Sequence, residues 1–465
     1  MNLADYASYD AVGLAALISS NQVSRTEVLD VAREALAVVN PAINAVVELY
    51  EPSSLPQGAS AGPFAGVPSL RKDIHREAGR RVEYGSRLSE GLVATETDEV
   101  LQRMNDAGVV FLGRSATSEF ALYGTTETLV HGPTRNPWDL SKSAGGSSGG
   151  AGAAVASGAV PIADASDAGG SIRIPASCCG LVGLKSTRVT VTRARSTADL
   201  NENVHSILAR SVRDIRTMVD VLGEPQTRDV DLVTVAPRLK VALSAQPWAP
   251  RTSVEPEIVR AVEQVAHEVG ALGSVVEIAR PEFEVEQFWN ALTVRLTAGV
   301  YKEGRALARE CGRVPSPKFM EPMSWKYFEA GAQVTWTDVE RALHDRDVVV
   351  RRVNDFFTHY DILITPTLQV LPPDLGTAGG FDMVASPLDH VLLGEMAGPN
   401  LALFNMTGHP AITVPTGMSA SGLPIGVQLV ARHGMDSLLL ALAAELEVRL
   451  PWSARQPIVH VSRAR

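Results

Sequence analysis

Residues 143–175 constrain the fold of this chain more than any other segment. Two glycine clusters within it carry serines, Ser147 and Ser148 in the first and Ser171 in the second. Glycine lacks a Cβ, so these turns can adopt a positive φ and bring backbone N–H groups close to a ligand. Between the clusters, the small apolar residues of 151–163 predict a closely packed buried helix followed by a short strand. The segment therefore predicts a helix–strand unit that brings two serine-bearing loops together.

Three other interpretations of this segment and its surroundings are less consistent with the sequence. Gly/Ser-rich runs often form flexible linkers, but this run leads directly into apolar residues. Residues 146–150 also fit the G-x-S-x-G nucleophile elbow with Ser148 as nucleophile, but that motif needs a preceding strand and 137–142 predicts a loop. Residues 180–186 resemble a phosphate-binding loop but lack its Gly-Lys pair at the required spacing. Two functional loops are the interpretation that we favour.

The composition excludes several classes of protein. A net charge of −10 without basic runs argues against nucleic acid as the main partner. The three cysteines, Cys178, Cys179 and Cys311, do not form a disulfide framework, so we expect a reducing, cytoplasmic environment. No apolar run reaches the roughly 18 residues that a membrane span needs, and no signal peptide is apparent at the N-terminus. We therefore expect a cytoplasmic protein that binds neither nucleic acid nor membrane.

Helical and strand patterns alternate along the chain. Helices are expected at 28–39, 98–107, 212–222, 256–272 and 437–450, with 283–357 mostly helical. Strands are expected at 44–50, 67–74, 109–112, 239–243, 274–278, 362–365, 411–415 and 424–430. Pro41 is expected to end the first helix, and 371–390 to form a long loop. This alternation predicts an α/β fold with parallel strand pairs and helices on the sheet faces, in one large domain.

A serine nucleophile needs a base, because its hydroxyl is weakly reactive until a base takes the proton. No histidine lies within the serine segment, although His75, His205 and His409 could approach it in space or simply be packing residues. Lysine is the alternative base if burial lowers its pKa. Lys72 lies near the end of the predicted strand 67–74, and hydrolases with a Ser-Lys pair exist. From the residues alone, Lys72 is either this base or a solvated cation.

Several motifs, in order along the chain, resemble those of the amidase signature family of serine hydrolases. They are Gly66-Val-Pro with Lys72-Asp73, Gly132-Pro-Thr-Arg-Asn-Pro-Trp-Asp139, Gly145-Gly-Ser-Ser-Gly-Gly150, Asp167-Ala-Gly-Gly-Ser-Ile-Arg173, Cys179-Gly-Leu-Val-Gly-Leu-Lys185, Asn405-Met-Thr-Gly-His-Pro-Ala411 and Gly422-Leu-Pro-Ile-Gly-Val-Gln428. The resemblance covers roughly residues 20–452. Within the family, the chain is most similar to bacterial amidases that hydrolyse nylon-oligomer cyclic dimers, aryl amides or carbamates.

The resemblance implies a single amidase domain over 1–465, with a twisted mixed central sheet covered by helices on both faces. It implies a catalytic core at about 60–215, substrate-pocket helices at about 283–357, and C-terminal strands and a helix at 405–450. It also implies that the reaction uses no cofactor. A metal is not expected either, because no cluster of His, Cys and Asp with ligand spacing occurs in the sequence.

The resemblance further implies a Ser–cisSer–Lys triad that forms an acyl-enzyme. Ser171 would be the nucleophile, Lys72 the base, and Ser147, following a cis peptide bond after Gly146, the bridge between them. The oxyanion hole would consist of the backbone N–H groups of Ala168, Gly169, Gly170 and Ser171. Supporting roles behind these groups would fall to Ser148, Asp167 and Arg173.

The substrate is expected to be an apolar or aryl amide, a carbamate or an ester. Residues 319–328 are rich in aromatic residues and Met, so they predict either a pocket wall or lid, or a core helix. The predicted substrate-binding residues are Ala121, Tyr123, Thr125, Gly145, Gly146, Phe319, Met320 and Trp325. A homodimer is one candidate assembly. The main alternative function is a glutaminase-type subunit that works within an amidotransferase complex; a non-catalytic binding protein would not need all three triad positions.

Overall fold

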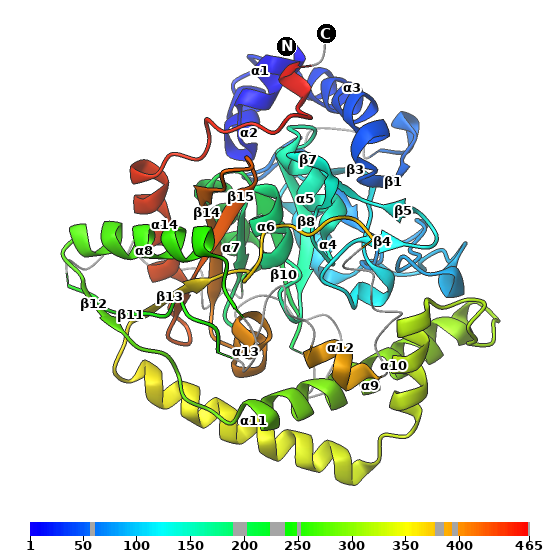
Figure 1. The fold of residues 1–465 in the computed structure, drawn as a ribbon. Helices are drawn as coiled ribbons and strands as arrows, with labels where there is room; N and C mark the ends of the chain where they lie inside the picture. Colours follow the sequence, from blue (N-terminus) through cyan, green and yellow to red (C-terminus); the bar gives the residue numbers. More distant parts are fainter. Residues whose placement is uncertain are drawn as a thin grey trace.

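An eight-stranded mixed sheet forms the centre of the molecule (Figure 1). The structure is a computed structural model that describes residues 1–55, 61–188, 202–223, 238–248, 253–376, 386–392 and 399–463. The strand order is β12-β11-β13-β15-β14-β9-β10-β8, and β11 is parallel to β12 and β13, whereas the other neighbours are antiparallel. The strands are β8 (Ile162–Asp167), β9 (Val182–Lys185), β10 (Val204–Ala209), β11 (Lys240–Leu243), β12 (Val275–Ile278), β13 (Ile362–Pro366), β14 (Ala411–Met418) and β15 (Pro424–Ala431).

A three-stranded sheet of order β1-β3-β2 contacts the large sheet through β2 and β8. Its strands are β1 (Val46–Leu49), β2 (Pro68–Lys72) and β3 (Val110–Ser115). Two strand pairs complete the β-structure of the described residues: β4 (Glu127–Thr128) with β5 (Gly132–Pro133), and β6 (Arg135–Asn136) with β7 (Asp139–Ser143). The contact between β2 and β8 brings Lys72 to the strand that leads into the second serine loop.

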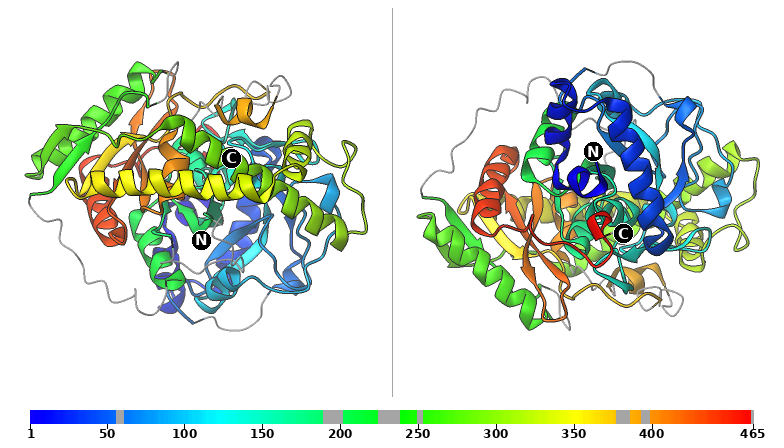
Figure 2. Two further views of the ribbon diagram at one scale, coloured as in Figure 1. Left: turned by 90° about the horizontal axis from the view of Figure 1, so that it is seen from below. Right: turned by 90° about the horizontal axis from the view of Figure 1, so that it is seen from above.

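Helices surround these sheets (Figures 1 and 2). They are α1 (Leu3–Ser8), α2 (Ala11–Ser19), α3 (Arg25–Ile43), α4 (Glu99–Asp106), α5 (Gly149–Ala156), α6 (Arg173–Cys179), α7 (Val212–Leu222), α8 (Pro256–Ala271), α9 (Val285–Glu310), α10 (Pro322–Ala332), α11 (Trp336–Phe357), α12 (Pro387–Leu392), α13 (Pro399–Thr407) and α14 (Asp436–Arg449). The long helix α11, yellow in Figure 2, crosses one side of the molecule. Among the described residues, no helix combines the length and apolar character needed to cross a bilayer.

Two hydrophobic cores lie on opposite faces of the large sheet, because successive strand residues point to opposite sides. In β13, Ile362 and Ile364 pack into one core, while Leu363 packs into the other. The first core also contains buried residues of α8 and α14, and the second contains those of α9 and α11. The predicted α/β fold, with a mixed sheet covered by helices on both faces, is confirmed. The subdivision of the domain into three parts stays a prediction.

Three local predictions were wrong. Pro41 does not end its helix, because α3 continues to Ile43. The helix ends after Ile43, where the Asn40 side chain accepts hydrogen bonds from the N–H groups of Ala45 and Val46. The predicted loop at 137–142 overlaps strand β7. The predicted loop at 371–390 runs into α12, and residues 377–385 of it lie outside the described part of the chain.

Candidate active site

Lys72 is the last residue of the fully buried strand β2. Its Nζ lies 2.8 Å from Ser147 Oγ and 3.2 Å from Ser166 Oγ. Burial lowers the pKa of Lys72 to about 7, although the carboxylates of Asp164 and Asp167 act in the opposite direction. A large fraction of Lys72 is therefore a neutral amine near neutral pH, and this amine can accept a proton from a hydroxyl group.

Ser147 lies in the loop between β7 and α5, and its peptide bond to Gly146 is cis. A Cβ on Gly146 would lie 2.6 Å from the carbonyl oxygen of Thr125, so glycine permits this close approach. The carbonyl of Ser147 also accepts from the backbone N–H of Ser118 at 3.4 Å. These contacts fix the loop so that the Ser147 hydroxyl meets Lys72.

The second serine loop, residues 168–172, is held by the carboxylate of Asp167 at the end of β8. Asp167 accepts from the backbone N–H of Gly170 at 2.7 Å and from Arg173 Nε and Nη2, both at 2.9 Å. Burial alone would raise the pKa of Asp167, but Arg173, Asn405 and the Gly170 N–H hold it well below its usual value. The carboxylate is therefore ionised and holds the loop in place. This arrangement is consistent with the supporting role predicted for Asp167 and Arg173.

Three of the four predicted oxyanion donors are available. Within the described part of the chain, the backbone N–H groups of Ala168, Gly169 and Ser171 have no protein acceptor. The N–H of Gly170 already donates to Asp167 and is therefore not free to bind an oxyanion.

Ser171 is the partly exposed serine among those of the two loops. Ser147 and Ser148 are both fully buried. The hydroxyl of Ser148 finds no hydrogen-bond partner among the described residues and has no access to a substrate. Although strand β7 precedes it, Ser148 is therefore poorly placed for the nucleophile-elbow interpretation, whereas Ser171 is partly exposed.

Comparison with known proteins identifies the family of this chain. The model of the family described as Amidase matches residues 27–440. The chain belongs to the amidase signature family. A 6-aminohexanoate-cyclic-dimer hydrolase from Pseudomonas sp. (strain NK87) is 35% identical, with 96% of both chains covered. An acylamidase from Rhodococcus erythropolis is 32% identical, also with 96% of both chains covered.

A solved structure shows the same relationship. A 6-aminohexanoate cyclic dimer hydrolase complexed with substrate superposes with a TM-score of 0.87 at 32% identity, covering 98% of this chain and 100% of the other. This amidase is thus an amide C–N hydrolase, and its relatives include enzymes named for cyclic and for linear amides.

A pocket of about 140 Å³ lies between the segment 118–129 and the start of α10. Of the predicted substrate-binding residues, Tyr123 and Thr125 line it, together with Met323 and the carboxylates Glu119, Glu127 and Glu321. The remaining predicted residues, Ala121, Gly145, Gly146, Phe319, Met320 and Trp325, are not part of its lining. Its lining includes none of Lys72, Ser147 and Ser171, so the apolar substrate pocket expected from the sequence stays a prediction.

Much of the segment 319–328 packs into the protein core, and its role as a substrate-pocket wall stays a prediction. Met320 and Met323 are buried in the second hydrophobic core, and the Trp325 ring stacks on Phe328 with centroids 5.4 Å apart. Helix α10 packs closely on α9. A Cβ on Gly331 would lie only 2.1 Å from the carbonyl oxygen of Thr297, so glycine is required at this contact. Residues 322–328 belong to the core helix α10, and Met323 in its first turn also lines the pocket.

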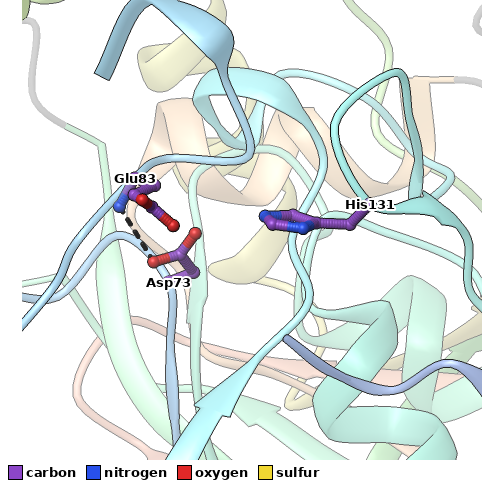
Figure 3. A group of neighbouring side chains, drawn as sticks. All are labelled: Asp73, Glu83 and His131. Atoms are coloured by element: carbon purple, nitrogen blue, oxygen red, sulfur yellow. Dashed lines mark hydrogen bonds between the residues drawn. The ribbon is translucent and has the colours of Figure 1, made fainter. Parts of the chain in front are cut away.

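A cluster of Asp73, Glu83 and His131 lies just beyond Lys72 in the chain (Figure 3). One potential metal-ligand atom from each residue lies within 4.8 Å of the others. However, Arg114 donates to Asp73 at 2.6 Å and to Glu83 at 2.8 Å, so a guanidinium is already paired with both carboxylates. We therefore interpret the cluster as an ion-pair network that holds the chain after Lys72.

Sequence reasoning missed Asp164 and Ser166 behind Lys72, although it named His75 and His205 as residues that could approach the serine segment. Asp164 Oδ2 accepts from the backbone N–H of Lys72 at 3.0 Å and lies 2.6 Å from His75 Nδ1, and His205 lies against the His75 ring. Asp164 and Ser166 are two residues apart in β8, so both face Lys72. This spacing is the signal that would have identified them.

Proposed function

We propose that this amidase cleaves its amide through a relay from Ser171 through Ser147 to Lys72. Neutral Lys72 accepts the proton of Ser147, which accepts the proton of Ser171, and the Ser171 oxygen attacks the amide carbonyl. The proton returns through Ser147 to the leaving nitrogen, and water then hydrolyses the acyl-enzyme. The observation that carries this proposal is the buried Lys72 amine 2.8 Å from Ser147 Oγ.

The tetrahedral intermediate would be stabilised by the N–H groups of Ala168, Gly169 and Ser171. Such donors act on the charge that develops in the transition state, and losing one costs about 10²–10³-fold in rate. Their lack of any acceptor within the described part of the chain supports this role. Because Asp167 and its partners hold the loop in advance, little reorganisation is needed during the reaction.

The proposed substrates are small carboxylic amides, including aryl amides, with carbamates and esters as further candidates. The relatives named for cyclic dimers and acyl amides support this range. The purified protein should be assayed on the 6-aminohexanoate cyclic dimer, anilides, aliphatic amides, carbamates, esters and free glutamine. Hydrolysis of simple amides by the isolated chain would support the proposal. Activity on glutamine alone, and only with a partner protein, would favour an amidotransferase subunit.

The pH dependence follows from the protonation of Lys72. We expect kcat/KM on amides to rise with pH through one ionisation near the pKa of about 7 and to stay high in alkali, because the neutral amine is the working form. A pH–rate profile with a soluble anilide measures this directly. A profile that is flat between about pH 5 and pH 9 would contradict Lys72 as the base.

Replacing Asp164 by asparagine tests the origin of this ionisation. The Asp164 carboxylate favours the protonated ammonium, so Asp164→Asn should lower the pKa of Lys72 and shift the rise in kcat/KM to lower pH. Asp106→Asn, an exposed carboxylate on α4, is the matched control and should leave the profile unchanged. An unchanged or alkaline-shifted profile in Asp164→Asn would contradict this electrostatic account.

A further inference from the structure

Arg295 connects helix α9 to the loop that carries the proposed oxyanion donors. Its Nη2 donates to the carbonyl oxygen of Ala168 at 3.0 Å. Its Nε lies 3.1 Å from Glu202 Oε2, and the two side chains are 10% and 1% exposed. The relay from Ser171 to Lys72 gives this largely buried arginine no role, although it is bonded directly to the loop.

The contact with the Ala168 carbonyl fixes the direction of the neighbouring N–H. In a planar trans peptide, the C=O of one residue and the N–H of the next point to opposite sides. A carbonyl of Ala168 held by Arg295 therefore turns the N–H of Gly169 away from α9. In the same way, Asn405 donates to the carbonyl of Asp167 at 2.9 Å and turns the N–H of Ala168.

Among the described residues, little packs against the peptide between Ala168 and Gly169. A Cβ on Gly169 would find, in this part of the chain, only the Ala402 Cβ within 4 Å, at 3.9 Å. Glycine is also the residue with the widest choice of backbone conformations, so side-chain packing at Gly169 does not by itself fix this peptide. An external anchor is needed to keep the Gly169 N–H in one direction, and Arg295 supplies it.

We infer that Arg295, held by Glu202, is a positioning residue that orients the Gly169 N–H of the oxyanion hole. The inference rests on the proposed function, because it assigns the 168–171 loop to the oxyanion. Arg295 acts through the peptide rather than on the substrate. It should therefore influence the transition state and leave ground-state binding unchanged.

The test compares Arg295 variants with a control on the same helix. Arg295→Met is combined with Glu202→Gln, so that no buried carboxylate is left without its cation. Arg295→Lys, which keeps the charge but not the planar fork, is the second variant if the double variant fails to fold. Arg305→Met, an exposed arginine of α9, is the control. Each protein is assayed for kcat and KM, and for binding of a trifluoromethyl ketone and of the matching alcohol.

The ketone forms a tetrahedral adduct whose oxyanion needs the donors, whereas the alcohol does not. We expect kcat and ketone affinity to fall together by about 10–10²-fold in the Arg295 variants. This effect is smaller than the rate loss of about 10²–10³-fold that follows removal of a whole donor. KM, alcohol affinity and the Arg305→Met control should stay unchanged. Unchanged kcat and ketone affinity in a folded variant would overturn the inference, as would equal weakening of ketone and alcohol.

Fluorophosphonate labelling of the wild-type protein separates this inference from the function on which it rests. Labelling at Ser171 together with unaffected Arg295 variants would overturn the inference alone. Failure to label Ser171 in an active enzyme would overturn the proposed relay and the inference together.

Discussion

Replacing Lys72 by methionine should lower kcat/KM on amides by about 10⁴-fold, the upper range for loss of a general base. Methionine fills a similar volume but cannot accept a proton from Ser147. Because Lys72 is fully buried and its pKa is lowered to about 7, the apolar replacement should leave the protein folded with an unchanged or higher melting temperature. Steady-state kinetics and a thermal melt of the same preparation give both results.

Lys72→Arg is the decisive companion variant. Guanidinium stays protonated at any usable pH, so it cannot act as the base and amide hydrolysis should not recover. Esters should lose less activity than amides in both variants, since an alkoxide leaves with less help from a proton than an amine does. Near-normal amide hydrolysis by Lys72→Arg would contradict the relay and would reduce Lys72 to a structural cation.

Replacing Ser171 by alanine should abolish turnover, with a loss of about 10⁶-fold, because the attacking oxygen itself is removed. Covalent labelling by a fluorophosphonate should disappear with it, while the fold stays intact because Ser171 is partly exposed. Activity and gel-based labelling measure the two effects.

Ser148→Ala is the matched control for Ser171→Ala. Its hydroxyl is buried and has no hydrogen-bond partner in the described part of the chain, so its removal should leave labelling intact. Retained labelling in Ser171→Ala, with labelling lost in Ser148→Ala, would favour the nucleophile-elbow interpretation with Ser148 as the nucleophile.

The sequence predicted those parts of the site that local chemistry determines. Glycine clusters around Ser147 and Ser171 marked two loops, since the backbone there must approach closely or adopt a positive φ. The alternation of helices and strands predicted the α/β class. The strand β8 was expected to be short, but it runs on to Asp167 and so carries Asp164 and Ser166 to Lys72.

The rest of the site depends on contacts between segments that are distant in sequence. Arg295 meets Ala168, and Asn405 meets Asp167, through tertiary packing that no local pattern encodes. The acidic pocket also depends on contacts between distant segments, because Glu127 and Glu321 come together through the packing of α10 on the segment 118–129. The aromatic composition of 319–328 predicted an apolar wall, yet most of these side chains serve the core between α9 and α10.

Locating the covalent adduct tests the central claim most directly. Trypsin should release residues 143–173 as one peptide, since no Lys or Arg lies between Lys142 and Arg173. After treatment with a fluorophosphonate, fragment-ion sequencing of this peptide identifies the modified serine. The relay predicts a single adduct on Ser171 that forms faster as pH rises through about 7, with the ionisation of Lys72. An adduct on Ser148, or labelling of Ser171 that is independent of pH and of Lys72, would contradict the account.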